Sequence, residues 1–180
     1  MERTQALQAW LRQLFPEEKW RIEPASADAS FRRYFRIHFA GPGESRIVMD
    51  APPQKENCKP FIHVAGLLHN AGLNAPEILA QDLEQGFLLL TDLGTTTYLT
   101  ALKQDDTTAD ALFRDAFDAL IAWQLSSRRD VLPPYDRVLL RRELDLFPQW
   151  YLARHLNLVL SPGQSAVSYT HLTLPTILRV

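Results

Sequence analysis

Small and hydroxyl-bearing residues followed by arginines form the first stretch of this sequence that could bind a phosphate. The stretch consists of Ser26, Ala27, Asp28, Ala29, Ser30 and Phe31. Arg32, Arg33 and Arg36 follow it. Small side chains let backbone N–H groups approach an anion closely, and hydroxyl and guanidinium groups add further donors. The same residues also suit an ordinary turn that enters a strand with a solvated face, so both interpretations stay open.

Metal and disulfide chemistry are not indicated by the sequence. Cys58 is the single cysteine and has no partner for an internal disulfide. Four histidines were considered as ligands, namely His63, His69, His155 and His171. None has ligand-like spacing with nearby carboxylates, so we predict no metal ligand in this chain.

Charge and composition favour a globular protein that acts on small molecules. The formal net charge is -2, which gives no overall basic field for nucleic acid or an anionic membrane. Hydrophobic residues make up 46% of the 180 positions, enough for an ordinary core. Glu2 and Arg3 interrupt the amino-terminal apolar residues, and no apolar stretch approaches the length of a membrane span. We therefore expect a soluble, cytoplasmic protein of unassigned oligomeric state.

Hydrophobic periodicity predicts a helix, then strands with one helix inserted, and then helices. Helices are predicted over residues 4–15 and from about Pro60 to Gly72, and strands over 31–39, 46–49, 78–83 and 87–91. Beyond Gly94 a strong helical stripe runs from Leu112 to Ile121. Another helix follows a cap at Asp136, and Pro148 kinks or divides it. This order predicts an α+β fold with a sheet-rich lobe and a helical lobe.

Residues 1–93 are expected to form the first lobe and residues 94–163 the start of the second. The sequence changes character after that point, because Arg179 is the only charged residue after Leu160. The run from Ser168 to Thr176 also resembles a peptide translated from sequencing-adaptor DNA. We expect residues 164–180 to be foreign to the protein and the chain to be carboxy-terminally truncated.

Three stretches in order carry a resemblance to a known family: residues 26–36, Met49-Asp50-Ala51-Pro52-Pro53, and residues 86–94. Together they resemble the aminoglycoside phosphotransferase family, which has a protein-kinase-like fold. Within it they are most similar to bacterial kinases that phosphorylate the anomeric position of N-acetylmuramic acid and N-acetylglucosamine in cell-wall recycling. The resemblance covers approximately residues 1–163.

The resemblance implies phosphoryl transfer from ATP with Mg²⁺, with a nucleotide and an amino sugar as partners. It implies a set of nucleotide-binding residues: Ser26, Ala27, Asp28, Ala29, Ser30, Phe31, Arg33, Met49, Thr91, Asp92 and Leu93. The first six correspond to the loop over the phosphates, and the last three to a hinge whose backbone binds adenine. Glu56 corresponds to an acid that orients a cation, although a solvated glutamate near a helix start is an equally ordinary explanation.

Two positions depart from the family pattern. The phosphate loop contains no glycine, because none occurs between Pro24 and Gly41. Met49 stands where kinase-like proteins carry a lysine that binds ATP. Either Arg33 or Arg46 replaces that lysine, or the phosphates rely on metal ions. Asp50 fits either a functional role or a turn at the strand end, and we favour the turn.

The family places its catalytic aspartate in a His-Gly-Asp or His-Arg-Asp loop, and no such pattern follows Trp150. No catalytic residue or metal ligand is therefore assigned, and the chain alone is expected to be inactive. An acidic and aromatic cluster could line a sugar site or serve only capping and packing: Tyr135, Asp136, Glu143, Asp145 and Trp150. Two alternatives remain, a non-catalytic nucleotide-binding or scaffolding module and an aminoglycoside kinase of the same family.

Overall fold

The computed structural model describes residues 2–27, 30–41, 43–105 and 108–173. The chain divides into two compact units, Met1–Ser127 and Arg128–Val180. The first unit contains a sheet, two helices that pack on the sheet and two further helices. The second contains only helices and connecting segments within its described residues.

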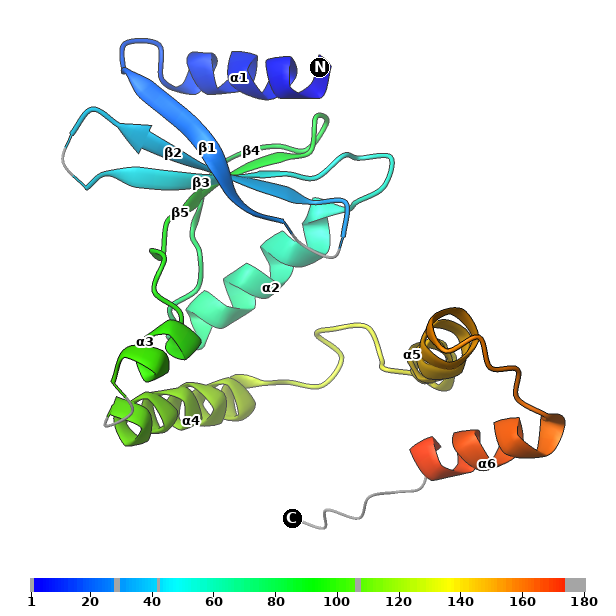
Figure 1. Cartoon of the computed structure of the whole chain (residues 1–180). Coiled ribbons are helices and arrows are strands. Elements are labelled where there is room, and N and C mark those ends of the chain that lie inside the picture. Colours follow the sequence, from blue (N-terminus) through cyan, green and yellow to red (C-terminus); the bar gives the residue numbers. More distant parts are fainter. Residues whose placement is uncertain (1, 28–29, 42, 106–107, 174–180) are drawn as a thin grey trace. The chain divides into compact units, whose positions relative to one another are not determined.

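Five strands form an antiparallel sheet in the first unit (Figure 1). In chain order they are β1 (Trp20–Ala27), β2 (Arg33–Phe39), β3 (Ser45–Asp50), β4 (Ile78–Asp82) and β5 (Phe87–Thr91). Their order across the sheet is β1-β2-β3-β5-β4. β3 and β5 therefore lie inside the sheet, and β1 is an edge strand, the position that tolerates Pro24.

Helix α1 (Glu2–Leu14) covers one face of the sheet, which we call the α1 face (Figure 1). Its apolar residues Leu7, Trp10 and Leu11 recur at helical spacing and are buried. They pack against alternate residues of the inner strands, namely Ile37, Val48, Phe87 and Leu89. This cluster is the larger of two hydrophobic cores.

Helix α2 (Cys58–Asn70) packs on the opposite face, the α2 face (Figure 1). Cys58 and partly buried α2 side chains contact the second set of alternate strand residues, which includes Met49, Leu88 and Leu90. Asn57 caps the helix by accepting a hydrogen bond from the N–H of Lys59 at 3.0 Å. Because both faces are covered, the run Phe87 to Leu90 is buried throughout, as its continuous apolar sequence predicts.

The remaining helices follow the sheet in the sequence. Helices α3 (Tyr98–Gln104) and α4 (Ala109–Ser126) belong to the first unit, and α5 (Arg137–Leu146), the π-helix η2 (Phe147–His155) and α6 (Pro162–Thr173) belong to the second. The side chain of Asp136 caps α5 by accepting from the N–H of Leu139 at 2.8 Å. Pro148 divides the predicted helix, because the α-helical pattern gives way to a π-helix beginning at Phe147.

The predicted α+β fold with an antiparallel sheet, an inserted helix and following helices is confirmed. Three elements were not predicted, β1, α3 and α6. The strand predicted at 31–39 begins two residues later in the structure, at Arg33. Phe31 precedes β2 and is 58% exposed. The division into lobes 1–93 and 94–163 stays a prediction, as does the foreign origin of residues 164–180, of which residues 174–180 lie outside the described residues.

Candidate functional site

The α2 face is apolar under α2 and polar along β2. Residues directly paired in an antiparallel sheet share a face, and neighbours along a strand alternate. Phe35, Ile37 and Phe39 belong to the core on the α1 face. The intervening Tyr34, Arg36 and His38 therefore lie on the α2 face. This polar strip is the part of the sheet where charged groups could meet a ligand.

Arg36 links this strip to the segment that leaves β5. Its guanidinium donates from Nε to Oδ2 of Asp92 at 2.6 Å and from Nη2 to Oδ1 at 3.1 Å. Nη2 also donates to the carbonyl of Gly94 at 3.2 Å. The geometry is bidentate, and the side chains of Arg36 and Asp92 are only 16% and 6% exposed. The pair fixes the chain where it turns away from the sheet.

The carboxylate of Asp92 has two more donors besides Arg36. Ser45 donates its hydroxyl at 2.7 Å, and the N–H of Gly94 donates at 2.9 Å. The Arg36 guanidinium holds the pKa of the Asp92 carboxyl far below its usual range, and the Ser45 and Gly94 bonds add to this effect, while burial opposes it. Asp92 is therefore a structural anion that fixes the hinge.

The backbone after β5 presents an N–H group that a ligand could use. The N–H of Thr91 donates to the carbonyl of Glu77 at 3.0 Å, and the Thr91 hydroxyl accepts from the N–H of Glu77 at 3.0 Å. Among the described residues, none accepts a hydrogen bond from the N–H of Leu93, and the residue is 56% exposed. An amide without such a partner on a fixed segment suits the edge of a planar heterocycle, which is the chemistry predicted for Thr91, Asp92 and Leu93.

Glu56 holds the beginning of β2 in two places. Its Oε1 accepts from the N–H of Phe31 at 3.1 Å, and its Oε2 accepts from Nε of Arg32 at 3.2 Å. Burial lowers the pKa of Arg32, but the hydrogen bonds with Glu56 and Tyr34 outweigh it and raise that pKa. The Phe31 ring is not packed in a core and lies 4.1 Å from Nζ of Lys55. Glu56 thus has a specific partner and is not merely a solvated residue.

The loop between β1 and β2 occupies the position predicted for a phosphate loop. Asp28 and Ala29 lie outside the described residues. Before them, Ser26 pairs with Tyr34 and Ala27 with Arg33 in the β1–β2 register. After them, the Ser30 hydroxyl accepts from the N–H of Arg32 at 3.2 Å. The structure thus brings Ser26, Ser30 and Phe31 together at one hairpin.

Arg33 does not share a face with Tyr34 and Arg36. It lies on the α1 face, where its Nε donates to Oδ2 of Asp50 at 3.0 Å and its Nη2 also meets that carboxylate. Arg3 of α1 donates to Oδ1 of Asp50 at 2.6 Å and to the carbonyl of Gln85 at 2.6 Å. The Asp50 side chain is fully buried. Asp50 ends β3 as expected, but its role is to join α1, β2 and the β4–β5 turn.

Met49 and Arg46 lie on opposite faces of the sheet. Met49 is 1% exposed and packs against Cys58 and Leu88 under α2. Arg46 is paired with Ile37 on the α1 face and donates to Glu44 at 3.1 Å. Neither of the two arginines considered as replacements for a lysine therefore lies on the α2 face. The position of Arg46 follows from strict alternation with Met49.

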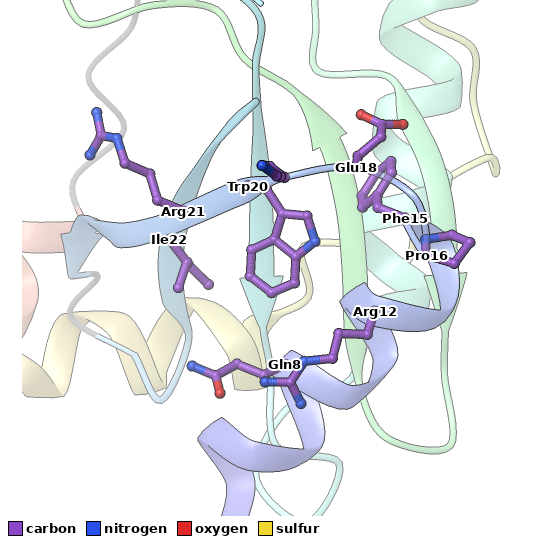
Figure 2. A pocket seen from close by; sticks show the side chains of 9 residues that line it. Gln8, Arg12, Phe15, Pro16, Glu18, Trp20, Arg21 and Ile22 are labelled. Carbon is purple, nitrogen blue, oxygen red and sulfur yellow. The ribbon is translucent and has the colours of Figure 1, made fainter. Parts of the chain in front are cut away.

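Two pockets lie apart from the hinge. The larger, of about 490 Å³, lies between the end of α1 and the start of β1, and Figure 2 shows Gln8, Arg12, Trp20 and Ile22 among its lining residues. The smaller, of about 310 Å³, includes Glu56, Cys58 and Gly86. Neither of these two pockets is lined by Thr91, Asp92 or Leu93.

Four residues of the predicted acidic and aromatic cluster have local partners, namely Asp136, Glu143, Asp145 and Trp150. Asp136 caps α5, Asp145 accepts from Arg141 at 2.8 Å, and Glu143 accepts from Arg142 at 3.1 Å. Trp150 stacks with the Arg154 guanidinium, which lies 4.0 Å from its ring.

Within the described residues, no group of three or more His, Cys, Asp and Glu side chains could hold a metal ion. In the same residues no helix is both long and apolar enough to cross a membrane.

Comparisons with known proteins extend these observations. The family described as "Phosphotransferase enzyme family" matches residues 21–167. An N-acetylmuramate/N-acetylglucosamine kinase of Pseudomonas aeruginosa is 55% identical over 168 residues, covering 88% of this chain and 48% of that protein. The protein of the same description in Pseudomonas putida is 49% identical over 174 residues, covering 91% of this chain and 50% of its own length.

A third relative, from Neisseria meningitidis, carries the same description and is 42% identical over 159 residues. The match covers 87% of this chain and 47% of that protein. The chain thus spans about half the length of the curated relatives it matches.

Proposed function

The chain belongs to the phosphotransferase enzyme family, whose members transfer phosphate from ATP, and we propose that it forms the nucleotide-binding part of an amino-sugar kinase. The substrates would be N-acetylmuramic acid and N-acetylglucosamine, phosphorylated at the anomeric hydroxyl. The observation that carries this proposal is 55% identity, over 88% of the chain, with a protein described as an N-acetylmuramate/N-acetylglucosamine kinase.

The geometry supports separate places on the α2 face for the adenine and for the triphosphate of ATP. Adenine would accept a hydrogen bond from the N–H of Leu93, on a segment that the Arg36–Asp92 pair holds in place. The triphosphate would extend toward the hairpin that contains Ser26 and Ser30. Positioning and neutralisation of phosphate charge are the main contributions a protein makes to phosphoryl transfer. We therefore assign ATP binding, and no proton transfer, to these residues.

Mg²⁺ does not fit the described residues. They include no cluster of three or more side chains able to hold a metal, and the carboxylates nearest the face, Asp92 and Glu56, already accept hydrogen bonds from arginines. No catalytic base is assigned either, because no His-Gly-Asp or His-Arg-Asp pattern follows Trp150 in this sequence. The proposal for this chain by itself is nucleotide binding without turnover.

Binding and turnover can be tested separately. Titration of the isotope-labelled chain with ATP, followed by amide NMR, should shift the signals of Leu93 and of residues 30–34 but not those around Trp20. A phosphate-transfer assay with both amino sugars should show no product from this chain and product from the Pseudomonas aeruginosa relative run in parallel. Absence of ATP binding would contradict the proposal.

The same phosphate-transfer assay discriminates an amino-sugar kinase from the two alternatives, an aminoglycoside kinase and a non-catalytic nucleotide-binding module. Transfer to an aminoglycoside, but not to either amino sugar, by a protein that contains this chain and has the length of the curated relatives would favour an aminoglycoside kinase. ATP binding by that protein without transfer to any sugar would favour a non-catalytic module. Transfer to the amino sugars alone is the expected outcome.

A further inference from the structure

We propose that Arg32, oriented by Glu56, is the cation that this chain places against the phosphates of the nucleotide. The inference rests on the proposed function, because it assigns a role within the same ATP site. Met49 stands at the position of the ATP-binding lysine, but its buried thioether cannot neutralise phosphate charge. Another residue must therefore supply the cation.

The position of Arg32 is the first argument. Arg32 lies between the Ser26–Phe31 loop and β2, so its contacts, and not strand alternation, decide its place. Its hydrogen bonds with Glu56 and with Tyr34, a residue of the α2 face, place it on that face. No other arginine of the loop–β2 segment is so close to the hairpin on this face.

Elimination is the second argument. Arg33 and Arg46 lie on the α1 face, held by Asp50 and Glu44. Arg36 lies on the α2 face, but its Nε and Nη2 donate to Asp92 and Gly94, and only 16% of its side chain is exposed. Among the arginines of β2, β3 and the loop before β2, Arg32 is the one left on the α2 face without a bidentate carboxylate partner.

The hydrogen-bonding pattern of Arg32 is the third argument. Glu56 uses only the Nε of Arg32, at 3.2 Å, and accepts its second bond from the N–H of Phe31. Tyr34 also hydrogen-bonds this guanidinium, but Glu56 and Tyr34 together do not use all five of its N–H donors, and 31% of the side chain is exposed. A guanidinium held through Nε in this way can turn its terminal N–H groups toward a phosphate, for which its planar geometry is suited.

Glu56 is a positioning residue in this arrangement. It immediately precedes Asn57, the cap of α2, so it ties the start of α2 to both the main chain and the first arginine after the loop. Its carboxylate is largely buried, with 13% of the side chain exposed. Any displacement of α2 relative to the hairpin would therefore move Arg32 as well.

The test compares ATP with adenosine, which lacks phosphates, as ligands of the chain in amide NMR titrations. Arg32→Ala should weaken ATP binding by about tenfold or more, because a charge-assisted hydrogen bond is lost, and should leave adenosine binding within about twofold. Arg32→Lys should recover part of the ATP affinity, since it restores the charge but not the planar fork. Arg46→Ala, on the opposite face, is the matched control and should bind both ligands as the unmodified chain does.

The role of Glu56 is tested by a double-mutant comparison. Glu56→Gln keeps the acceptor for the Phe31 N–H but removes the charge, and it should weaken ATP binding severalfold. If Glu56 acts through Arg32, the Arg32→Ala/Glu56→Gln double variant should bind ATP no more weakly than Arg32→Ala alone. Additive losses would overturn the positioning role.

Three outcomes would overturn the assignment of Arg32. One is unchanged ATP affinity in Arg32→Ala when the unmodified chain binds ATP, which would leave the proposed function standing. Another is an equal loss of ATP and adenosine affinity, which would indicate a general structural effect. A loss in Lys55→Ala but not in Arg32→Ala would move the role to Lys55. If the unmodified chain binds neither ligand, the proposed function fails together with this inference.

Discussion

Arg33 and Arg36 lie three positions apart on β2, yet their side chains leave opposite faces of the sheet and meet carboxylates with different surroundings. On the α1 face, Asp50 is fully buried and is shared by Arg33 and Arg3 in a core closed by a helix. On the α2 face, Arg36 and the N–H of Gly94 both donate to Asp92 and so fix the segment that follows β5. One strand therefore contributes to the closed core on one face and, on the other, to the site that we propose for the nucleotide.

The comparison predicts where substitutions change the free energy of unfolding and where they change binding. Phe87→Ala should have the largest effect. The Phe87 ring is fully buried on the α1 face, 5.6 Å from the ring of Trp10 and 4.9 Å from the Arg3 guanidinium. Its removal should lower the free energy of unfolding by about 3–5 kcal/mol, measured by urea denaturation.

The matched control for Phe87→Ala is Phe31→Ala, which removes the same ring from a position that is 58% exposed. It should cost less than about 1 kcal/mol, because little apolar area is returned to water. A comparable decrease in the free energy of unfolding in the two variants would show that the α1 face is no better packed than the start of β2.

Gly86→Ala should have the next largest effect. Gly86 has a φ of +73°, and a Cβ there would lie 2.0 Å from the carbonyl oxygen of Ala51. Left-handed backbone and the contact with main-chain atoms together should cost about 2–4 kcal/mol. The turn also accepts a hydrogen bond from the N–H of Ala51 at 2.9 Å, so the end of β3 should loosen with it.

Gly72→Ala measures the cost of the left-handed backbone alone, and so separates it from the steric contact with Ala51 at Gly86. Gly72 has a φ of +75° with no atom within 4 Å of a Cβ, so only the conformational cost of about 1–2 kcal/mol applies. Urea denaturation of both variants should therefore show a smaller loss at Gly72. Equal losses would mean that the approach of Gly86 to Ala51 contributes nothing.

Asp92→Asn should lower the free energy of unfolding by about 2 kcal/mol at pH 7, because Arg36 loses a charged acceptor. The effect should depend on pH. The folded pKa of Asp92 lies below its unfolded value of about 3.9, so the stability it contributes is complete above that value and declines as the pH falls below it. The difference in the free energy of unfolding between the unmodified chain and Asp92→Asn should therefore be smaller by about 1 kcal/mol at pH 3 than at pH 7.

Urea denaturation at pH 7, 5 and 3 checks this expectation. Asp118→Asn is the control, since Asp118 is an exposed residue of α4, and its effect should stay within about 0.5 kcal/mol at every pH. A difference for Asp92→Asn that stays constant from pH 7 to pH 3 would show that the charge of Asp92 does not hold the hinge.

Local sequence signals were enough to predict most of the sheet. Residues 87–91 form a buried strand because a continuous apolar run needs cover on both faces, and 46–49 lies within β3. β1 was missed because Pro24 interrupts its pattern and because its strand character comes from pairing with β2, with a register shift between Pro24 and Ser26. Long-range pairing of this kind leaves no local signal.

The candidate site was predictable in position but not in its contacts. The chain segment after β5 could be located from the end of an apolar run. The partners of Asp92 could not, because Arg36 is 56 positions away and Ser45 is 47 positions away. Alternation along β2 separates Arg33 from Arg36, yet only the burial of Asp50 explains why an arginine is placed on the apolar face.

Arg46→Ala should have the smallest effect on folding. Its guanidinium pairs with Glu44, two positions away on the same hairpin, and the side chains are 33% and 53% exposed. Exposed pairs of this kind contribute about 0–1 kcal/mol, and screening by salt reduces that further. The free energy of unfolding should therefore change by less than about 1 kcal/mol, and the change should shrink when the urea titration is repeated in 0.5 M NaCl. A loss of 2 kcal/mol or more that salt does not reduce would place Arg46 among the residues that hold the α1 face together, beside Arg3 and Arg33, and it would remove Arg46 as a neutral control for the arginines of the α2 face.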